Sequence, residues 1–468
     1  MFSSDFSETI DYRRNNNLEV DLDLNALVIK FCLPYLLGNR TLIKNVLRTP
    51  WMSDYKGKGE WEPHFLPEHG NLNPEKEKFV VKLKNALLNE ASEYLVGKKN
   101  IGILLSGGMD SRILAGVLRE LELKSDKAIN IIALSWGDQN SRDVIYAHRI
   151  AKKFNWDIKH YPITVETLAK NIKFSGQNGA EFSPFHLHAM EEVSKTHGID
   201  VIIAGSYGDS VGRAEFSGKH LTKLKSLVPG SIDPYGFLKL EVINNTSEII
   251  QKDLKDTTFF EGDINLLRRR EIEQEMHYMR RMLQACMQTI SLNIPVHQLF
   301  TSVEVFGLMW SLDPTYRNNN WYKLLLEELP GNLLDIPWAR NGKLYDAPNE
   351  KPLDNFSNRY HQYGKWFRND LRDDVLKRIY SNNIQKLNIF NDKGLDRLVK
   401  VWSKSNTNGI TIFDEYMGWL CSLNDMMDIY SISSPNCTYQ ESNIDWFRGN
   451  YGALKAQSFL YLRNKVRK

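Results

Sequence analysis

The sequence predicts an α/β fold, in which a twisted parallel sheet is flanked by helices and is followed by a mostly helical C-terminal region. Two observations carry this prediction. Short apolar runs typical of buried strands alternate with helical patterns between about residues 95 and 206. After about Phe237 the pattern is mostly helical. Strands that alternate with helices form βαβ units, so we expect a parallel sheet with helices on both faces.

The elements before the sheet are expected to be simple. Residues 1 to about 20 are polar and are predicted to be frayed, whereas 21–51 show a helical pattern that indicates a packed element and its connection. Residues 52–74 are rich in Gly, Pro and charge, which is typical of an irregular linker. An amphipathic helix is predicted over 75–96, directly before a first strand at 101–105.

The alternation then continues along the chain. The following elements are predicted: strands at 129–135, 157–161 and 199–206, and helices at 142–154, 185–197, 268–277 and 320–329. At 468 residues the chain is long enough for two or three domains. We expect an N-terminal segment with its linker over 1–74, a sheet domain over 75–345 and a helical region over 346–468.

Composition argues against several classes of protein. A formal net charge of +3 gives no reason to expect nucleic acid or a membrane as a partner. No run of about 18 apolar residues occurs and no apolar segment lies near the N-terminus, so neither a membrane span nor a signal peptide is expected. The cysteines are far apart, which argues against a zinc ribbon or a disulfide framework and favours a reduced, cytoplasmic setting: Cys32, Cys286, Cys421 and Cys437.

The segment after the first strand carries the strongest chemical signal. The run IGILL ends in SGGMDS (106–111), after which apolar residues recur at helical spacing. Two glycines let the backbone turn tightly, and the free N–H groups of the new helix then face the turn. The serines add hydroxyl donors, and Asp110 adds a carboxylate suited to holding Mg²⁺ against phosphates. The loop is therefore predicted to bind phosphate, although it has neither the Walker lysine nor the GxGxxG pattern.

Two other loops are expected to join this one. The loops at Ser106, Ser135 and Ser206 all follow predicted strands. Ligands of open parallel sheets bind beyond the carboxyl ends of the strands, so the three loops should meet at one edge.

Several segments carry a family resemblance. The SGGMDS loop resembles the pyrophosphate-binding loop of the N-type ATP pyrophosphatases, which cleave ATP between the α and β phosphates. AGSYGDSVG (204–212) is similar to the SGxGxDExxGG segment of asparagine synthetases. The resemblance to their synthetase domain covers about residues 95–345 and implies an adenine nucleotide alpha hydrolase-like fold. It also implies that Asp110 and Asp209 bind Mg²⁺ on ATP, as two carboxylates around a breaking P–O bond can do. The alternative for Asp209 is a helix or turn cap.

The lysine helix of the same family has a counterpart here. NWYKLLLEELP (320–330) resembles it, which implies that Lys323 stabilises the oxyanion of amide formation. PWARNGK (337–343) is similar to the basic stretch that follows, and Arg340 and Lys343 are candidates for pyrophosphate or a substrate carboxylate. Each of these cations could instead be an ordinary surface charge.

The resemblance implies a full nucleotide-binding set, in which the backbone near Ser135 contacts adenine. Its members are Leu105, Ser106, Gly107, Gly108, Asp110, Ser111, Leu134, Ser135, Gly205, Arg340 and Lys343. Asp143, at the start of the helix that follows the adenine-side loop, is interpreted as an N-terminal helix charge.

The chain also departs from the family. Ser206 stands where a catalytic glutamate is expected, and a serine is a poor general base at neutral pH. Tyr207 is the candidate substitute, although a shift of one residue turns its side chain to the opposite side. The Pro-Phe-Leu-Asp segment of the family appears as PVHQ (295–298), without its carboxylate. Arg112 replaces the common small residue, which we associate with relatives that act on sugar acids or secondary metabolites.

The glutaminase half of the family is expected to be missing. Residues 21–51 look like the tail of a glutaminase domain, but the rest has no counterpart, and Met1 is followed by Phe2 rather than by the nucleophilic cysteine. The chain is therefore not expected to hydrolyse glutamine. Nitrogen would come from ammonia, from an amine or from a separate glutaminase.

These features predict a ligase that uses ATP and Mg²⁺ to adenylate a carboxylate on a small molecule, glycan or peptide, which a nitrogen nucleophile then attacks. Two alternatives stay open: an intramolecular cyclase like the β-lactam or lasso-peptide synthetases, and a nucleotide-binding scaffold without activity. A metal site at His186 and His188, with Glu191 and Glu192 beyond, matches no zinc spacing, so pocket or surface residues are the preferred interpretation.

Overall fold

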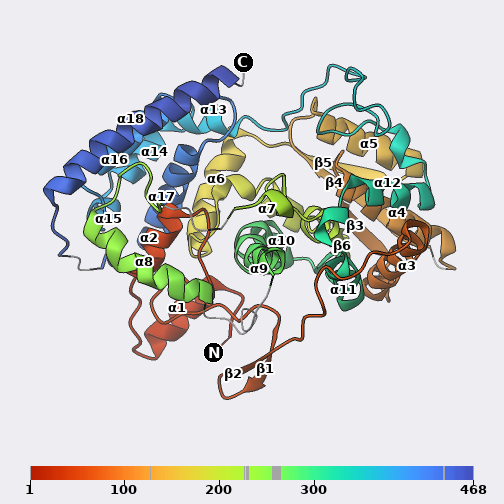
Figure 1. Cartoon of the computed structure of the whole chain (residues 1–468), viewed down its shortest axis with the longest axis horizontal. Coiled ribbons are helices and arrows are strands. Elements are labelled where there is room, and N and C mark those ends of the chain that lie inside the picture. The colour runs from red at the N-terminus through yellow and green to blue at the C-terminus, as the bar shows by residue number, and fades with distance from the viewer. Residues whose placement is uncertain are drawn as a thin grey trace.

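A five-stranded parallel sheet organises one half of the molecule (Figure 1). The computed structural model describes residues 2–126, 128–225, 227, 231–255, 265–435 and 438–466, so Cys437 lies outside the described residues. The strands are, in spatial order, β5 (Asp157–Tyr161), β4 (Asn130–Trp136), β3 (Asn100–Leu104), β6 (Val201–Ala204) and β9 (Val296–Gln298). All neighbouring pairs are parallel. The predicted fold class is confirmed, and β9 adds an edge strand that was not predicted.

Each face of the sheet is covered by helices, because alternate side chains of a strand point to opposite faces. One face packs against α3 (Lys76–Leu95), α4 (Met109–Lys124), α5 (Arg142–Phe154), α11 (Val303–Ser311) and α12 (Asn319–Glu328). Ile101 and Ile103 of β3 belong to this core, whereas Leu104 belongs to the core on the other face. There the sheet meets α7 (Met190–Ser194) and α10 (Gln284–Ser291). Both faces are thus buried, as a parallel sheet requires.

The second half of the molecule is helical and combines distant parts of the chain (Figure 1). Its elements are α1 (Phe6–Asn15), α2 (Leu24–Cys32), α6 (Val165–Gln177), α8 (Leu240–Lys255), α13 (Tyr363–Arg368), α14 (Arg372–Ile379), α15 (Asn382–Gln385), α16 (Gly394–Ser403), α17 (Ile412–Ile429) and α18 (Asn443–Val466). They share one hydrophobic core that includes Trp402 and Trp419. The N-terminal segment therefore packs with the C-terminal helices.

The structure corrects the expectations for the N-terminal segment. Residues 6–15 form α1 rather than a frayed end, because Asp5 caps the helix and Ile10 is fully buried. The helix in 21–51 stops at Cys32, since Pro34 follows directly and residues 33–50 contain no helix. The predicted linker contains a hairpin of β1 (Ser53–Gly57) and β2 (Glu60–Pro63).

Two predicted helices are also broken. Residues 185–197 contain a 3-10 turn and the short α7, because His188 adopts a left-handed φ of 49° between them. The helix over 268–277 begins as α9 (Leu266–Glu273) and continues as a π-helix, η5 (Gln274–Leu283). A small antiparallel pair, β7 (Glu215–Phe216) and β8 (Lys219–His220), follows the loop after β6. Among the described residues, no helix combines the length and apolar character needed to cross a membrane.

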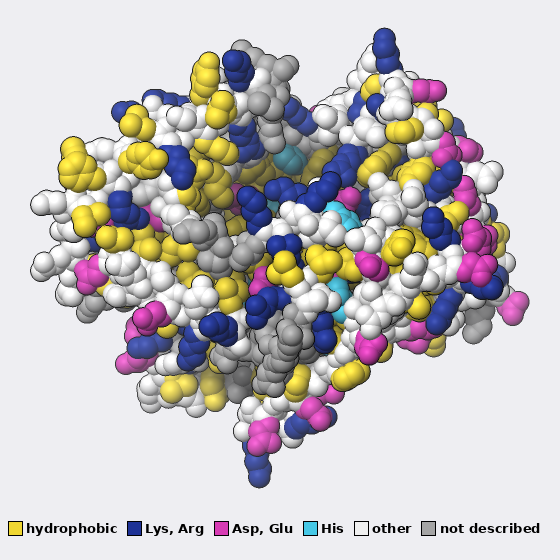
Figure 2. All heavy atoms as spheres, in the orientation of Figure 1, with side chains coloured by type: hydrophobic (Ala, Val, Ile, Leu, Met, Phe, Trp, Pro, Cys, Tyr) yellow, Lys and Arg dark blue, Asp and Glu magenta, His cyan; other side chains and the backbone are white. Residues whose placement is uncertain are grey.

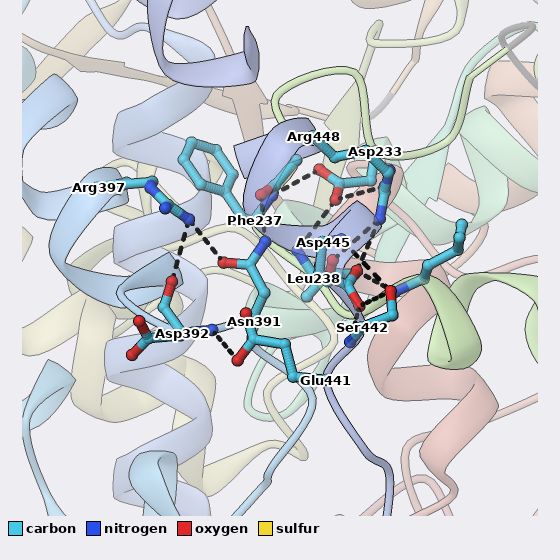
Figure 3. Close-up of polar contacts among 12 residues, drawn as sticks. Asp233, Phe237, Leu238, Asn391, Asp392, Arg397, Glu441, Ser442, Asp445 and Arg448 are labelled. Atoms are coloured by element: carbon cyan, nitrogen blue, oxygen red, sulfur yellow. Dashed lines mark hydrogen bonds and ion pairs between the residues drawn. The ribbon is translucent and has the colours of Figure 1, made fainter. Parts of the chain in front are cut away.

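Polar contacts hold α18 against the rest of the helical half (Figure 3). The Asp445 carboxylate accepts hydrogen bonds from the Leu240 N–H at 2.6 Å and from the Ser442 N–H at 3.0 Å. Arg448, one turn further along, lies 3.4 Å from Asp233. The Asp233 carboxylate in turn accepts from the N–H of Leu238 at 2.9 Å. The start of α18 is therefore fixed to the segment that leads into α8.

Candidate functional site

The SGGMDS loop connects β3 to α4 at the carboxyl edge of the sheet. The Gly108 N–H donates to Ser106 Oγ at 3.1 Å, and Ser111 Oγ donates to the Ser106 carbonyl at 2.8 Å. A Cβ at Gly107 would lie 2.7 Å from the Cβ of Ala339, so only glycine fits there. The loop thus stabilises itself internally and presents the N-terminus of α4, the arrangement that binds anions.

Arg112 holds the SGGMDS loop in place by donating hydrogen bonds to main-chain carbonyls. Its side chain is 1% exposed and donates to the carbonyls of Gly107 at 3.0 Å and Leu333 at 3.1 Å, and also to those of Ile336 and Pro337. These bonds join the loop to the segment after α12. Arg112 is therefore structural here, and the link that we predicted to the choice of substrate has no support from its position.

The two predicted metal ligands face each other across the loops that follow β3 and β6. A Cβ at Gly208 would lie 2.6 Å from Asp110 Oδ1, so glycine lets the two loops touch. Asp110 Oδ1 is buried and has no hydrogen-bond partner among the described residues. Burial raises the pKa of Asp110 above its ordinary value, while the positive charge of Arg213 opposes that rise. An unpartnered carboxylate oxygen suits a hard cation such as Mg²⁺.

Arg213 lies between these two carboxylates. It forms an ion pair with Asp209, and its Nη2 lies 3.4 Å from Asp110 Oδ2. The residues therefore fit a cation at Asp110 Oδ1, whereas the space between Asp110 and Asp209 already contains a guanidinium. The predicted pair of metal ions does not fit this arrangement.

The adenine-side residues lie inside the sheet. Leu134 and Ser135 are both buried in β4, and the Leu134 carbonyl accepts from the Leu105 N–H at 2.9 Å. Leu105 is itself buried. The side chains of these three residues are therefore enclosed by the protein. Gly205 follows β6 directly, and a Cβ at this position would lie 3.3 Å from the Asp110 carbonyl oxygen.

The positions that depart from the family point in different directions. Ser206 is exposed, and its N–H donates to Gln298 Oε1 at 3.3 Å. Tyr207 turns away and donates its hydroxyl to Gln284 Oε1 at 2.8 Å. Burial raises the pKa of Tyr207 well above its ordinary value, which makes the phenol a poor proton acceptor at neutral pH.

On α12 it is Tyr322, rather than Lys323, that faces the loops. The Tyr322 hydroxyl donates to the Gly208 carbonyl at 2.6 Å, and its ring lies 5.0 Å from the Arg213 guanidinium. Lys323 is partly exposed, and its Nζ lies 2.6 Å from Asp346 Oδ1. That hydrogen bond raises the pKa of Lys323.

Arg340 and Lys343, the two cations of the basic stretch, make contacts in different places. Arg340 lies 3.6 Å from Glu215, a carboxylate that Arg213 also approaches at 4.0 Å. Lys343 instead donates from Nζ to the Pro348 carbonyl at 2.8 Å. Arg340 thus borders the loop carboxylates, and Lys343 points away from them.

Comparison with known proteins fits this geometry. Residues 82–289 match the family model described as asparagine synthase. This part of the chain is an asparagine synthase domain. No curated protein matches. The match confirms the resemblance drawn from the loops.

Three solved structures show a distant similarity to this chain. The U34-tRNA thiolase NcsA from Methanococcus maripaludis is 14% identical, with 73% of this chain and 86% of that chain covered at a TM-score of 0.28. NMN synthetase from Francisella tularensis is 12% identical, with 54% and 94% covered at a TM-score of 0.22. NAD+ synthetase from Burkholderia pseudomallei is 12% identical, with 53% and 86% covered at a TM-score of 0.22.

Two residues at the site of the asparagine synthase domain were missed as site residues. Arg213 is the residue directly after the AGSYGDSVG motif (204–212). In the sequence, Tyr322 looks like an ordinary apolar position of a helix. Asp143 was interpreted as a helix charge, yet it accepts a hydrogen bond from the Gly107 N–H. Burial raises its pKa to about 6. The only sequence signal for these residues was the position of Tyr322 directly before Lys323, a predicted site residue. The contacts of Arg213 and Asp143 depend on tertiary structure, so the sequence does not reveal them.

Histidines gather beside the end of β4 in the asparagine synthase domain. The His188 ring stacks near Trp136 at 6.4 Å and near His361 at 6.5 Å. Burial lowers the pKa of His188 to about 3. Among the described residues, no three or more His, Cys, Asp or Glu side chains form a group that could hold a metal ion. His188 is thus an uncharged ring packed among other aromatic rings. This environment is compatible with the preferred interpretation of His186 and His188 as pocket residues.

A cavity of about 590 Å³ lies behind Tyr207, bordered by Gln284. Arg48 and Arg280 line it together with Glu181. Arg48 and the buried Arg281 both pair with the Glu181 carboxylate, at 3.1 and 2.7 Å. Arg280 donates to the neutral Asn39 Oδ1 at 2.9 Å and to the Thr49 carbonyl at 2.6 Å, and its Nη1 is buried without a hydrogen-bond partner among the described residues.

Proposed function

We propose that this chain is an ATP-dependent, amide-forming ligase that adenylates a substrate carboxylate and releases pyrophosphate. The observation that carries the proposal is the SGGMDS loop of an asparagine synthase domain, which places an unpartnered Asp110 oxygen at the N-terminus of α4. Phosphates and a hard cation are the ligands that this combination suits.

The phosphates would be bound by the main chain of 106–108 and the hydroxyl of Ser111. Asp110 would hold Mg²⁺, which supplies Lewis-acid stabilisation of the phosphate charge. Arg213 and Arg340 border the same place and oppose the charge of the departing pyrophosphate. Lys323 would need to leave Asp346 to reach an oxyanion, a rotation open to a partly exposed side chain.

The acceptor half of the reaction would not use a carboxylate base at the family position. Ser206 carries none, and Tyr207 is engaged with Gln284. The nitrogen nucleophile would therefore arrive as ammonia, from a separate glutaminase or from solution, or as an amine. Glutamine alone is not expected to serve as the donor.

The cavity behind Tyr207 would receive the substrate. Arg280 is a half-buried cation whose buried Nη1 has no hydrogen-bond partner among the described residues, and a guanidinium binds a carboxylate through paired hydrogen bonds. Burial and the neighbouring arginines lower the pKa of Arg280 to about 9, so it remains charged at neutral pH. A bound anion would offset the cost of its burial.

Carboxylate-dependent exchange of labelled pyrophosphate into ATP tests the function. A panel of small, glycan and peptide carboxylates should contain at least one that supports exchange, and Asp110→Ala should abolish it. Asp373→Ala is the matched control, because Asp373 holds the same second position in α14 and is exposed. Exchange that survives in Asp110→Ala would contradict the proposal.

The two alternatives predict other outcomes. Because Ser206 replaces a catalytic glutamate, a nucleotide-binding scaffold would bind ATP without exchange for any carboxylate. An intramolecular cyclase would form product with no added ammonia or amine. Release of glutamate from glutamine by the purified chain would refute the predicted lack of glutaminase activity.

A further inference from the structure

We propose that Arg213 replaces one of the two metal ions expected at the phosphates, so that the site holds one divalent cation and one built-in guanidinium. The inference rests on the proposed function in that ATP is the ligand. It concerns how the phosphates are bound, and it is independent of which carboxylate is activated.

The position of Arg213 is fixed on every side. Its side chain is 3% exposed, and its Nη1 donates to Asn319 Oδ1 at 2.7 Å. The guanidinium lies over the ring of Tyr322 at 5.0 Å and that of Trp338 at 5.9 Å. A side chain confined in this way is part of the site rather than a mobile surface cation.

Arg213 provides the positive charge that a metal ion would otherwise provide between Asp110 and Asp209. Two carboxylates on adjoining loops repel each other unless a positive charge lies between them. Arg213 supplies that charge to Asp110 and Asp209, and an arginine remains protonated at any working pH. A Mg²⁺ ion between the same carboxylates would have to displace a buried guanidinium. Because Arg213 approaches Asp110 Oδ2, the unpartnered Asp110 Oδ1 remains the oxygen for a single ion.

The planar guanidinium also carries donors that suit phosphate oxygens. Because this cation belongs to the chain, part of the phosphate affinity should persist when all divalent metal is removed. A site built on two metal ions would lose that affinity almost completely.

Metal stoichiometry and metal-free nucleotide affinity test this assignment without any turnover. Mn²⁺ is titrated by electron paramagnetic resonance in the presence of a non-hydrolysable ATP analogue, and the affinity for the analogue is measured by calorimetry in EDTA. The wild type should bind a single Mn²⁺ per chain and should retain the analogue in EDTA. Arg213→Ala should weaken metal-free binding by about tenfold or more, since one charge-assisted hydrogen bond is removed.

Arg40→Ala is the matched control. Arg40 also bridges two carboxylates, those of Asp23 and Asp253 at 2.6 Å each, but it lies in the helical half. It should leave both measurements unchanged. Arg213→Lys keeps the charge without the planar donors and should give an intermediate affinity. If thermal melting shows that Arg213→Ala does not fold, the lysine variant and the wild-type stoichiometry decide.

Two Mn²⁺ ions in the wild type, or equal metal-free affinity in wild type and Arg213→Ala, would overturn the assignment. These outcomes differ from failure of the proposed function. Absence of exchange with every carboxylate would remove the ligase while leaving the metal and nucleotide measurements intact.

A separate observation concerns the outer face of α18, and we infer that a second copy of this chain docks there. Figure 2 shows hydrophobic side chains gathered along this helix. Phe447, Tyr451, Leu454 and Tyr461 are each at least 65% exposed. With Ser458 and Lys465 they recur every four and three residues in turn, the spacing of a helix-pairing seam.

The opposite face of α18 is firmly held, so the exposure of the seam is a fixed feature. The contacts of Asp445 and Arg448 anchor its first turns (Figure 3). Gly452 lies directly against the Tyr235 carbonyl, where a Cβ would come within 1.9 Å. Ala456 and Leu460 continue the buried face.

An antiparallel copy of the same helix complements the seam. Pairing about a two-fold axis near Ala456 places Tyr451 against Tyr461 of the second copy and Leu454 against Ser458, a large side chain against a small one. Lys465 would meet the ring of Phe447, a favourable cation–π contact. Phe447, Tyr451, Leu454 and Tyr461 together offer on the order of 500 Å² per copy, or about 1,000 Å² in the pair, which is the lower end of the range for specific interfaces. An isologous contact of this kind forms a closed dimer.

Sedimentation velocity over a range of concentrations tests the dimer. The wild type should sediment as a dimer at micromolar concentration, and Tyr451→Glu should sediment as a monomer. Phe65→Glu is the matched control, because Phe65 is 90% exposed and lies far from α18 in the chain. A wild type that stays monomeric, including one that binds lipid vesicles as a monomer, or a Tyr451→Glu variant that stays dimeric, would overturn the inference.

Discussion

Gly208 is the residue on which the contact between the two strand-end loops depends. Its missing side chain leaves room for Asp110, whose Cβ would lie 2.8 Å from a Cβ at position 208. Any larger residue must push apart the loop after β6 and the loop after β3. This requirement follows from the backbone approach and not from a special φ value.

Gly208→Ala should therefore weaken nucleotide binding and destabilise the fold by about 1–3 kcal/mol, the usual cost of overpacking. Gly307→Ala in α11 is the control, because a Cβ there meets nothing within 4 Å. Chemical denaturation and calorimetric titration measure the two effects. An unchanged affinity in Gly208→Ala would show that the loops separate without consequence.

Asp143 links the loop to pH. Burial raises its pKa to about 6, above the ordinary value of an aspartate near 4, so between about pH 4 and pH 6 the folded chain binds a proton that the unfolded chain has released. Stability from this residue is therefore highest below about pH 4 and falls as the pH rises through 6. Asp143→Asn should remove this slope and stabilise the chain at pH 8 by on the order of 2 kcal/mol. Denaturant melts at pH 5 and pH 8 test it, with the exposed Asp373→Asn as the control.

At the scale of elements, η5 is a π-helix that carries a buried carboxyl. Glu275 is 5% exposed, and its Oε1 has no partner among the described residues. Burial raises its pKa to about 8, helped by the nearby charge of Glu271. π-helical turns are uncommon and concentrate at functional sites.

Glu275→Gln should change how stability depends on pH. The folded wild type keeps the proton up to about pH 8, whereas the unfolded chain loses it near pH 4.5, so wild-type stability falls across this window. The variant should lack the fall and exceed the wild type above pH 8 by up to about 5 kcal/mol. Thermal melts across the window measure the difference. Glu93→Gln, exposed on α3, should follow the wild type.

Periodicity predicted most elements of the sheet domain because strong local patterns determine them. The apolar runs of β3, β4 and β6 and the amphipathic α5 are legible in the sequence alone. β9 has three residues and forms only because β6 offers an open edge, so no local pattern reveals it. α1 was missed because one capping Asp and one buried Ile outweigh a polar composition.

The site was predictable to the same degree. The loop glycines and Asp110 are encoded locally, and they lie together as expected at the sheet edge. The neighbours of Asp110 come from other elements: Arg213 follows η2 (Gly208–Gly212), and Tyr322 lies on α12. Whether Tyr322 or Lys323 turns inward depends on how α12 packs against α3 and α4, which one sequence does not reveal.

At the scale of the whole molecule, the chain crosses between the sheet half and the helical half more than once, so neither half is one continuous segment. α6 belongs to the chain between β5 and β6, yet it packs against α17 near the C-terminus. The Ser422 hydroxyl donates to the Ile172 carbonyl at 3.0 Å, and a Cβ at Gly176 would lie 2.8 Å from the Ser422 carbonyl. The segment between β5 and β6 therefore contains a helix whose packing partners lie in the C-terminal part of the chain.

An excised 75–345 fragment should consequently be unstable. Removing the rest would expose Leu168 and Ile172, both now at most 1% exposed, and would leave the partners of α8 missing. We expect aggregation or strong binding of a hydrophobic dye, measured beside the full chain. A soluble, monomeric fragment with a cooperative melt would show that the two halves fold independently.

The anchoring of the phosphate loop by Arg112 has a consequence for biosynthesis. Three of the four carbonyls that receive this guanidinium belong to residues 333–337, more than two hundred positions later in the chain. During translation the loop emerges early, but its supporting contacts exist only after α12 and the segment beyond it have left the ribosome. Nucleotide affinity should thus arise late and abruptly as the chain lengthens, and a stalled nascent chain ending before residue 333 would carry the whole SGGMDS motif without a finished binding loop.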